Sequence, residues 1–154
     1  MAVKGVDSGD RMHKRYAGFY EAQQLVAEEA STGNSIIRLV NPRDDQRGGG
    51  GTSALNGGVI AYMFDGALGA AVASLATEKF GDANHDLPGY GESTISLTIN
   101  YVKPALGDTF EAHGTAIRTG KTVAFAEGKL YDEAGEICAT ASGVWRIFLP
   151  ERRD

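Results

Sequence analysis

Residues 55–75 read LNGGVIAYMFDGALGAAVASL, and this stretch decides the fold. Its larger apolar side chains recur at the spacing of one helix face, at Ile60, Met63, Phe64, Leu68, Val72 and Leu75. The positions between them are mostly Gly and Ala, so no face is strongly polar, which is typical of a buried helix. Asn56 is an accepted N-cap residue. We therefore predict one long, nearly all-buried helix that begins after Asn56 and ends near Phe80 and Gly81.

Asp65 is the only charged residue of this helix before Glu78. A carboxylate in an apolar helix is costly unless it is solvated or paired, and that makes Asp65 a candidate functional residue. A purely structural hydrogen bond to a neighbouring backbone is the alternative. Gly66 and Gly69 each weaken a helix relative to Ala, so we expect another group to approach the backbone there.

The glycine pair at the start of the helix is a candidate site of a different kind. Gly57 and Gly58 present bare amides at a helix N-terminus. Such amides attract negative charge, including the oxyanion that develops during acyl transfer.

The composition is ordinary for a globular protein of 154 residues, with 42% hydrophobic and 23% charged residues. A formal net charge of -5 argues against general nucleic-acid binding. The single cysteine, Cys138, allows no internal disulfide and no cysteine-based metal site. The first residues lack the pattern of a signal peptide, and the longest apolar stretch is interrupted by Asp65, so we expect a cytoplasmic protein with no membrane span.

The remaining chain predicts an α+β domain. We expect a flexible tail over 1–15 and a single domain over 16–154, with a helix from Tyr16 to Ala30 and a strand over 35–40. The glycine-rich loop over 44–53 lacks a following Gly-Lys-Ser/Thr, so a flap is favoured over a phosphate loop. Alternating polarity and turn residues then predict four antiparallel strands, at 94–101, 110–118, 121–131 and 136–148. One antiparallel sheet wrapped around the buried helix accounts for all these elements.

Three motifs, which follow one another along the chain, resemble the hotdog-fold acyl-CoA thioesterases. These enzymes belong to the 4-hydroxybenzoyl-CoA thioesterase superfamily, and the resemblance is closest to their phenylacetyl-CoA thioesterase-like group. The helix start from Asn56 to Asp65 resembles the His-Gly-Gly-Val-Ile start of that family and its following acid. The strand that ends at residues 101–105, YVKPA, resembles the Tyr-x-x-Pro-Ala ending. Residues 118–121, RTGK, resemble the Arg-x-Gly-Arg/Lys hairpin. The resemblance covers about residues 35–148 and implies the hotdog fold.

The resemblance also implies roles for individual residues. Asp65 matches the catalytic acid, which acts as general base or nucleophile, and Gly57 matches the glycine whose amide polarises the thioester carbonyl. Thr94 matches a residue that positions the water or the acid. Gly120 matches the hairpin glycine beside the pantetheine arm, and Lys121 follows it in the motif.

Two positions depart from the pattern. Asn56 stands where the family has histidine, and we expect it to anchor the carbonyl side of the substrate as well as to cap the helix, because an amide does no acid–base work near neutral pH. The family's polar residue six positions earlier falls at Gly50, within the glycine run.

The helix geometry predicts an oligomer. Gly57 and Asp65 are on the order of 10 Å apart along one helix, whereas a reacting carbonyl needs both groups within about 3 Å. If both act, Asp65 comes from a second chain across a two-fold axis. The family's sites likewise lie between protomers, so we expect a homodimer, pairing further into a homotetramer.

Other functions compete with acyl-CoA hydrolysis. A non-catalytic acyl-CoA-binding or regulatory hotdog protein would suit Asn56. A dehydratase or hydratase would need a histidine base, for which His85 is the nearest in sequence, although a solvated loop residue is the simpler interpretation. A metal site from Asp82, His85 and Asp86 lacks a second histidine at ligand spacing, so no metal and no cofactor are expected. The acyl group stays open: Tyr62, with Met63, Phe64 and Leu68, suits an aromatic or medium-length chain, and the same residues suit an ordinary core.

Overall fold

The computed structural model describes residues 18–48, 52–82, 84 and 87–151. The elements in chain order are β1 (Leu25–Ser31), β2 (Asn34–Val40), the 3-10 turn η1 (Asp44–Gln46), α2 (Gly57–Phe80), β3 (Gly91–Tyr101), β4 (Thr109–Thr119), β5 (Val123–Asp132) and β6 (Ile137–Phe148). One helical turn at residues 18–22 precedes β1. The predicted tail over 1–15, the end of the chain at 152–154, His85 and most of the glycine run lie outside the described residues.

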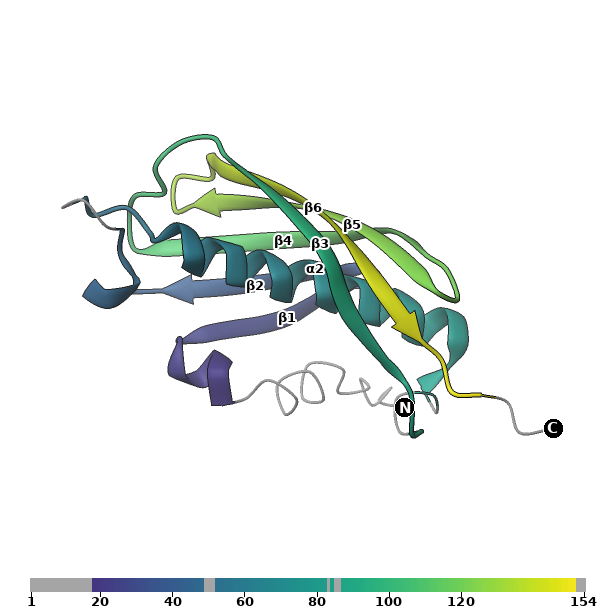
Figure 1. Ribbon diagram of the computed structural model, residues 1–154. Coiled ribbons are helices and arrows are strands. Elements are labelled where there is room, and N and C mark those ends of the chain that lie inside the picture. Colours follow the sequence, from purple (N-terminus) through teal and green to yellow (C-terminus); the bar gives the residue numbers. More distant parts are fainter. Residues whose placement is uncertain (1–17, 49–51, 83, 85–86, 152–154) are drawn as a thin grey trace, which may run out of the picture.

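The six strands form one sheet in the order β1-β2-β4-β5-β6-β3, and every neighbouring pair is antiparallel. The sheet curves around α2, which runs along its inner face (Figure 1). The core lies between them, where Met63, Phe64 and Leu68 of α2 meet Phe110 and Trp145 of the sheet. The predicted α+β architecture is therefore confirmed, as are the helix bounds and the four C-terminal strands to within a few residues.

The helix predicted from Tyr16 to Ala30 is wrong in its second half. Gln24 adopts a positive φ of 59°, which ends the helical turn, and residues 25–31 form β1. β1 pairs with β2 through a tight connection in which Gly33 has a φ of 76°. The Ala- and Glu-rich composition of this segment favours a helix, but pairing with the edge of a formed sheet outweighs so weak a preference.

The helix approaches the sheet closely at one point. A Cβ at Gly114 of β4 would overlap the backbone carbonyl of Ala67, so only glycine fits there. Next to it, the Ser35 hydroxyl donates a hydrogen bond to the same carbonyl oxygen. These contacts fix the position of α2 along the sheet, and with it the position of Asp65.

α2 is long and apolar enough, by length and composition, to cross a membrane. Half of its apolar window is buried against the rest of the fold. The place of α2 in the core accounts for its apolar sequence.

Candidate active site

The N-terminus of α2 is capped as predicted. Asn56 has the extended conformation of a cap residue, with φ -63° and ψ 135°, and its Oδ1 accepts a 2.7 Å hydrogen bond from the Gly58 amide. The Gly57 amide has no hydrogen-bond acceptor among the described residues. It remains available for a ligand oxygen at the positive end of a 24-residue helix.

A tyrosine of β3 supports this helix start. Tyr101 Oη donates a 2.8 Å hydrogen bond to the carbonyl oxygen of Gly57, and a Cβ at Gly57 would lie 3.3 Å from the same hydroxyl. Tyr101 belongs to the YVKPA motif, but its contact with the helix start was not predicted, because β3 and α2 meet only in the folded chain.

Asp65 and Thr94 are brought together as the resemblance implied. Thr94 Oγ1 donates a 2.7 Å hydrogen bond to Asp65 Oδ1. Asp65 is only half-buried, so solvent and the threonine hydroxyl together satisfy the carboxylate. The second oxygen of this carboxylate has no described protein partner and can accept a hydrogen bond from a water.

A pocket of about 280 Å³ adjoins the capped end of α2. Asn56 and Gly58 form part of its wall, and the apolar part consists of Phe19, Leu25, Val59 and Tyr62. Gln23 and Asp45 complete the lining. Of the four residues that the sequence offered for an acyl pocket, Tyr62 lines it, whereas Met63, Phe64 and Leu68 are fully buried in the core.

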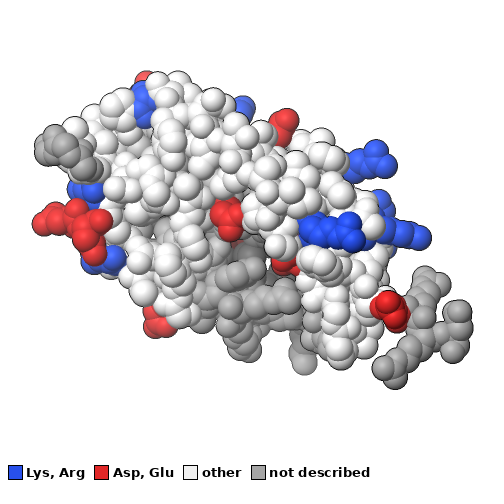
Figure 2. Space-filling view, viewed as in Figure 1, with Lys and Arg blue, Asp and Glu red and all other residues white. Residues whose placement is uncertain are grey.

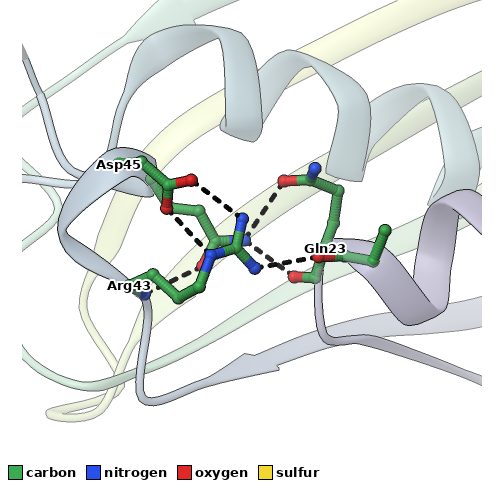
Figure 3. Close-up of polar contacts among 5 residues, drawn as sticks. Gln23, Arg43 and Asp45 are labelled. Carbon is green, nitrogen blue, oxygen red and sulfur yellow. Dashed lines mark hydrogen bonds and ion pairs between the residues drawn. The ribbon is translucent and has the colours of Figure 1, made fainter.

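Polar contacts hold the N-terminal helical turn beside this pocket (Figure 3). The buried Gln46 side chain donates from Nε2 to the Gln23 carbonyl oxygen at 2.7 Å and accepts at Oε1 from the Arg43 amide at 2.9 Å. Arg43 in turn donates from Nη1 to the Ala22 carbonyl oxygen and pairs with Asp45, both at 2.9 Å. We call this group of Ala22, Gln23, Arg43, Asp45 and Gln46 the polar latch. The polar latch was not predicted, because Gln46 stands among charged loop residues and belongs to no recognisable sequence pattern.

Gly120 and Lys121 lie at the opposite end of the molecule. The Gly120 amide donates to the Val123 carbonyl oxygen at 2.9 Å within the β4–β5 hairpin, and Lys79 near the C-terminus of α2 donates to the Thr119 carbonyl oxygen. A helix of 24 residues spans about 36 Å, so this hairpin and Gly57 of the same chain are far apart. In Figure 2 several Lys and Arg side chains lie at the right-hand end, where Figure 1 shows the β4–β5 hairpin, and others lie at the left-hand end.

Cys138 and possible metal ligands are the other groups to consider. Burial raises the pKa of the Cys138 thiol to about 11, so it stays protonated at neutral pH and is a poor nucleophile. No group of three or more metal-ligating side chains occurs in the described part of the chain. The hypothetical site of Asp82, His85 and Asp86 has two of its members outside that part.

A family model described as the thioesterase superfamily matches residues 53–139, more than half of the chain. The chain belongs to the thioesterase superfamily. The matched region runs from the helix start to the beginning of β6, so it includes Asn56, Gly57, Asp65 and Thr94, and it excludes the N-terminal helical turn, β1 and β2.

Relatives and solved structures agree with this assignment. The medium/long-chain acyl-CoA thioesterase YigI of Escherichia coli K12 is 30% identical over 100 residues, which cover 62% of this chain and 63% of YigI. The chain thus spans about three fifths of the length of the curated relatives it matches, 60 to 63%. A thioesterase family protein from Silicibacter pomeroyi superimposes with a TM-score of 0.75 at 18% identity, over 93% of this chain and 99% of the other.

The Escherichia coli PaaI protein from the phenylacetic acid degradation operon gives a TM-score of 0.68 at 14% identity, over 91% of this chain and 92% of PaaI. At these identities the structural likenesses show the fold alone. They confirm the predicted hotdog fold of this superfamily member.

Proposed function

We propose that this protein hydrolyses an acyl-CoA thioester to the free acid and CoA. The observation that carries the proposal is the hydrogen-bonded pair of Asp65 and Thr94, in which an apolar helix holds one carboxylate with an oxygen free for water. Membership of the thioesterase superfamily supports it. A cytoplasmic location and independence of any cofactor are part of the proposal.

The proposed chemistry uses Asp65 as general base. Asp65 accepts a proton from water, the water oxygen bonds to the acyl carbon, and the oxyanion that forms is stabilised by the Gly57 amide and by Nδ2 of Asn56. Collapse of this intermediate breaks the carbon–sulfur bond, and the proton held by Asp65 passes to the departing thiolate. Thr94 holds the carboxylate in position throughout.

We further propose that each site combines two protomers, with Gly57 and Asn56 from one and Asp65 and Thr94 from the other. The separation along α2 requires it if both groups act on one carbonyl. The same pairing would bring a partner's Gly120 and Lys121 hairpin to a site that is out of reach within one chain, where its positive charge suits the phosphates of CoA. The exposed apolar side chains of Ile117 in β4 and Phe148 in β6 leave surface for pairing of dimers into tetramers.

The test is Asp65→Asn, with Glu78→Gln as the control. Glu78 is an exposed carboxylate of the same helix that contacts none of the proposed groups. Release of CoA thiol from a panel of acyl-CoA thioesters should fall by roughly 10²-fold or more in Asp65→Asn and stay unchanged in Glu78→Gln. Near-normal turnover of a folded Asp65→Asn protein would refute the assignment.

A separate experiment tests whether Asp65 acts as a general base or as a nucleophile. In a single turnover in ¹⁸O-labelled water, a general base leaves the label only in the released acid. A nucleophilic Asp65 forms an anhydride with the acyl group, and water that opens this anhydride at the Asp65 carbonyl carbon leaves the label in the Asp65 carboxylate, so label in Asp65 identifies the nucleophilic route.

An acyl-CoA-binding protein without catalysis is the second candidate, favoured by Asn56, whose side-chain oxygen is already engaged with the Gly58 amide. In that case wild-type protein binds acyl-CoA without turnover, and Asn56→His should raise a negligible hydrolysis rate. Measured turnover by the wild-type protein distinguishes the two.

A further inference from the structure

The pocket at the capped end of α2 has a wall that comes from outside the region that the family model matches. Phe19, Gln23 and Leu25 lie before residue 53, where the family match begins. The Phe19 ring packs on the Tyr62 ring with their centroids 4.0 Å apart, and Tyr20 meets Tyr62 edge-on at 5.7 Å. The aromatic wall therefore joins the N-terminal helical turn to α2.

The position of this wall is fixed from two sides. Tyr20 is fully buried, and its hydroxyl lies so close to Gly66 that a Cβ there would overlap it. On the other side Arg43 and Gln46 of the polar latch donate hydrogen bonds to the carbonyl oxygens of Ala22 and Gln23, at the end of the turn (Figure 3). Phe19 therefore belongs to a helical turn whose position is fixed by these contacts, although Phe19 itself is 48% exposed.

We propose that this pocket binds the acyl group of the substrate and that Phe19 and Tyr62 set its specificity; the inference rests on the proposed function. The pocket is lined by Asn56, one of the two proposed oxyanion donors, and by Gly58, which follows the other donor in the chain, so an acyl chain inside it lies beside the proposed donors. Four of its eight lining residues are apolar, and the charged Asp45 is paired with Arg43. The substrate class is an apolar acyl group, either a medium-length alkyl chain or an aryl group.

The volume bears on the size of that group. A pocket of about 280 Å³ has room for several groups of the size of a water molecule, so it admits more than an acetyl group. A benzoyl or phenylacetyl group, or a medium-length alkyl chain, is the size of acyl group that we expect it to take. A longer chain projects into solvent and gains no further affinity from it.

The experiment measures binding rather than turnover, with ketone analogues of acyl-CoA in which a methylene separates the sulfur from the carbonyl. Acetonyl-CoA, phenacyl-CoA and analogues with medium and long alkyl chains are titrated into wild-type protein, Phe19→Ala and Tyr62→Leu by calorimetry. Phe125→Ala is the matched control, since this phenylalanine of β5 is exposed to a similar extent, 46%, and does not line the pocket.

Wild-type protein should bind the phenacyl and medium-chain analogues roughly tenfold or more tightly than acetonyl-CoA, because apolar surface is buried, with no further gain for the long chain. Phe19→Ala and Tyr62→Leu should lose most of that gain and keep their affinity for acetonyl-CoA, whereas Phe125→Ala should behave as wild type.

The proposal is overturned if wild-type protein binds the phenacyl and medium-chain analogues no more tightly than acetonyl-CoA. It is also overturned if this gain in affinity falls equally in all three variants, or falls in none of them. Loss of the gain on Phe19→Ala in a protein that never hydrolyses thioesters would uphold the pocket and reject the enzyme. If the protein hydrolyses acyl-CoA but its gain in affinity for the larger analogues does not depend on Phe19 and Tyr62, the proposal for the pocket is rejected and the proposed function stands.

Discussion

We predict two tasks for Asn56, which one side chain can perform together. Its Oδ1 accepts a hydrogen bond from the Gly58 amide, and its Nδ2 has no acceptor among the described residues, so it can donate to a ligand. The capping half of this prediction is confirmed by the structure. The donor half stays a prediction.

Substitution separates the two tasks. Asn56→Asp keeps an acceptor for Gly58 and should keep its stability, but it lacks the donor. Asn56→Ala loses both, so its free energy of unfolding should fall by about 1 kcal/mol and its hydrolytic barrier should rise by about 3 kcal/mol. Urea unfolding and kcat/KM on the best thioester measure the two effects, and full activity of Asn56→Ala would exclude a donor role.

At the scale of elements, two helix glycines that look alike in the sequence have different surroundings. A Cβ at Gly66 would overlap the Tyr20 hydroxyl, whereas a Cβ at Gly69 would make an ordinary contact of 3.5 Å with Trp145 Nε1. The expected close approach to the helix backbone is therefore confirmed at Gly66 and wrong at Gly69. It is the N-terminal helical turn that approaches.

The two glycines form a matched pair of tests. Gly69→Ala should raise the free energy of unfolding by up to about 1 kcal/mol, because Ala is the better helix former. Gly66→Ala should lower it by about 1–2 kcal/mol, because the methyl group displaces Tyr20 and overpacks the junction. Chemical denaturation of both variants checks the difference, and equal effects would show that the turn does not pack there in solution.

For the whole molecule, the shared site predicts complementation between two inactive chains. Gly57→Pro removes the amide proton at the first helical position, where proline is tolerated, and Asn56 already has a conformation allowed before proline. Mixed with Asp65→Asn and reassembled, half of the dimers should contain both chains, each with one intact site. About one quarter of wild-type activity should return.

Gly57→Ala is the control for this mixture, since it adds a Cβ near Tyr101 but keeps the amide proton. A mixture that stays inactive, while Gly57→Ala is active, would place Gly57 and Asp65 in the same chain's site. Sedimentation at assay concentration should give at least a dimer, and an active monomer would contradict the shared site.

Stability should also depend on pH through Asp132, which closes the β5–β6 turn. Hydrogen bonds from the backbone near Glu136, and then the Lys103 ammonium, lower the pKa of Asp132. A lowered folded-state pKa stabilises the fold above the unfolded pKa of about 3.9, and this stabilisation is lost as the pH falls through the folded value. Urea unfolding should find Asp132→Asn less stable than wild type at pH 7 and the difference smaller near pH 3; a gap that grows on acidification would contradict this.

The sequence by itself determined α2 and the strands that follow it. The spacing from Ile60 to Leu75 and the strict alternation over 94–101 are local signals, and each belongs to a single element. The cap at Asn56 could be predicted for the same reason. The pairing of Asp65 with Thr94 followed from resemblance, because neither residue alone indicates the other.

Only the tertiary structure decided what lies against the start of the helix. Residues 25–31 became a strand because β2 offered an edge for pairing, and Phe19, Gln46 and Tyr101 met the site through contacts between segments distant in sequence. Such contacts leave no periodicity, since each residue's role depends on its partner's position rather than on its own neighbours. Local sequence patterns therefore predicted the fold, whereas the pocket depends on packing between segments that are distant in the sequence.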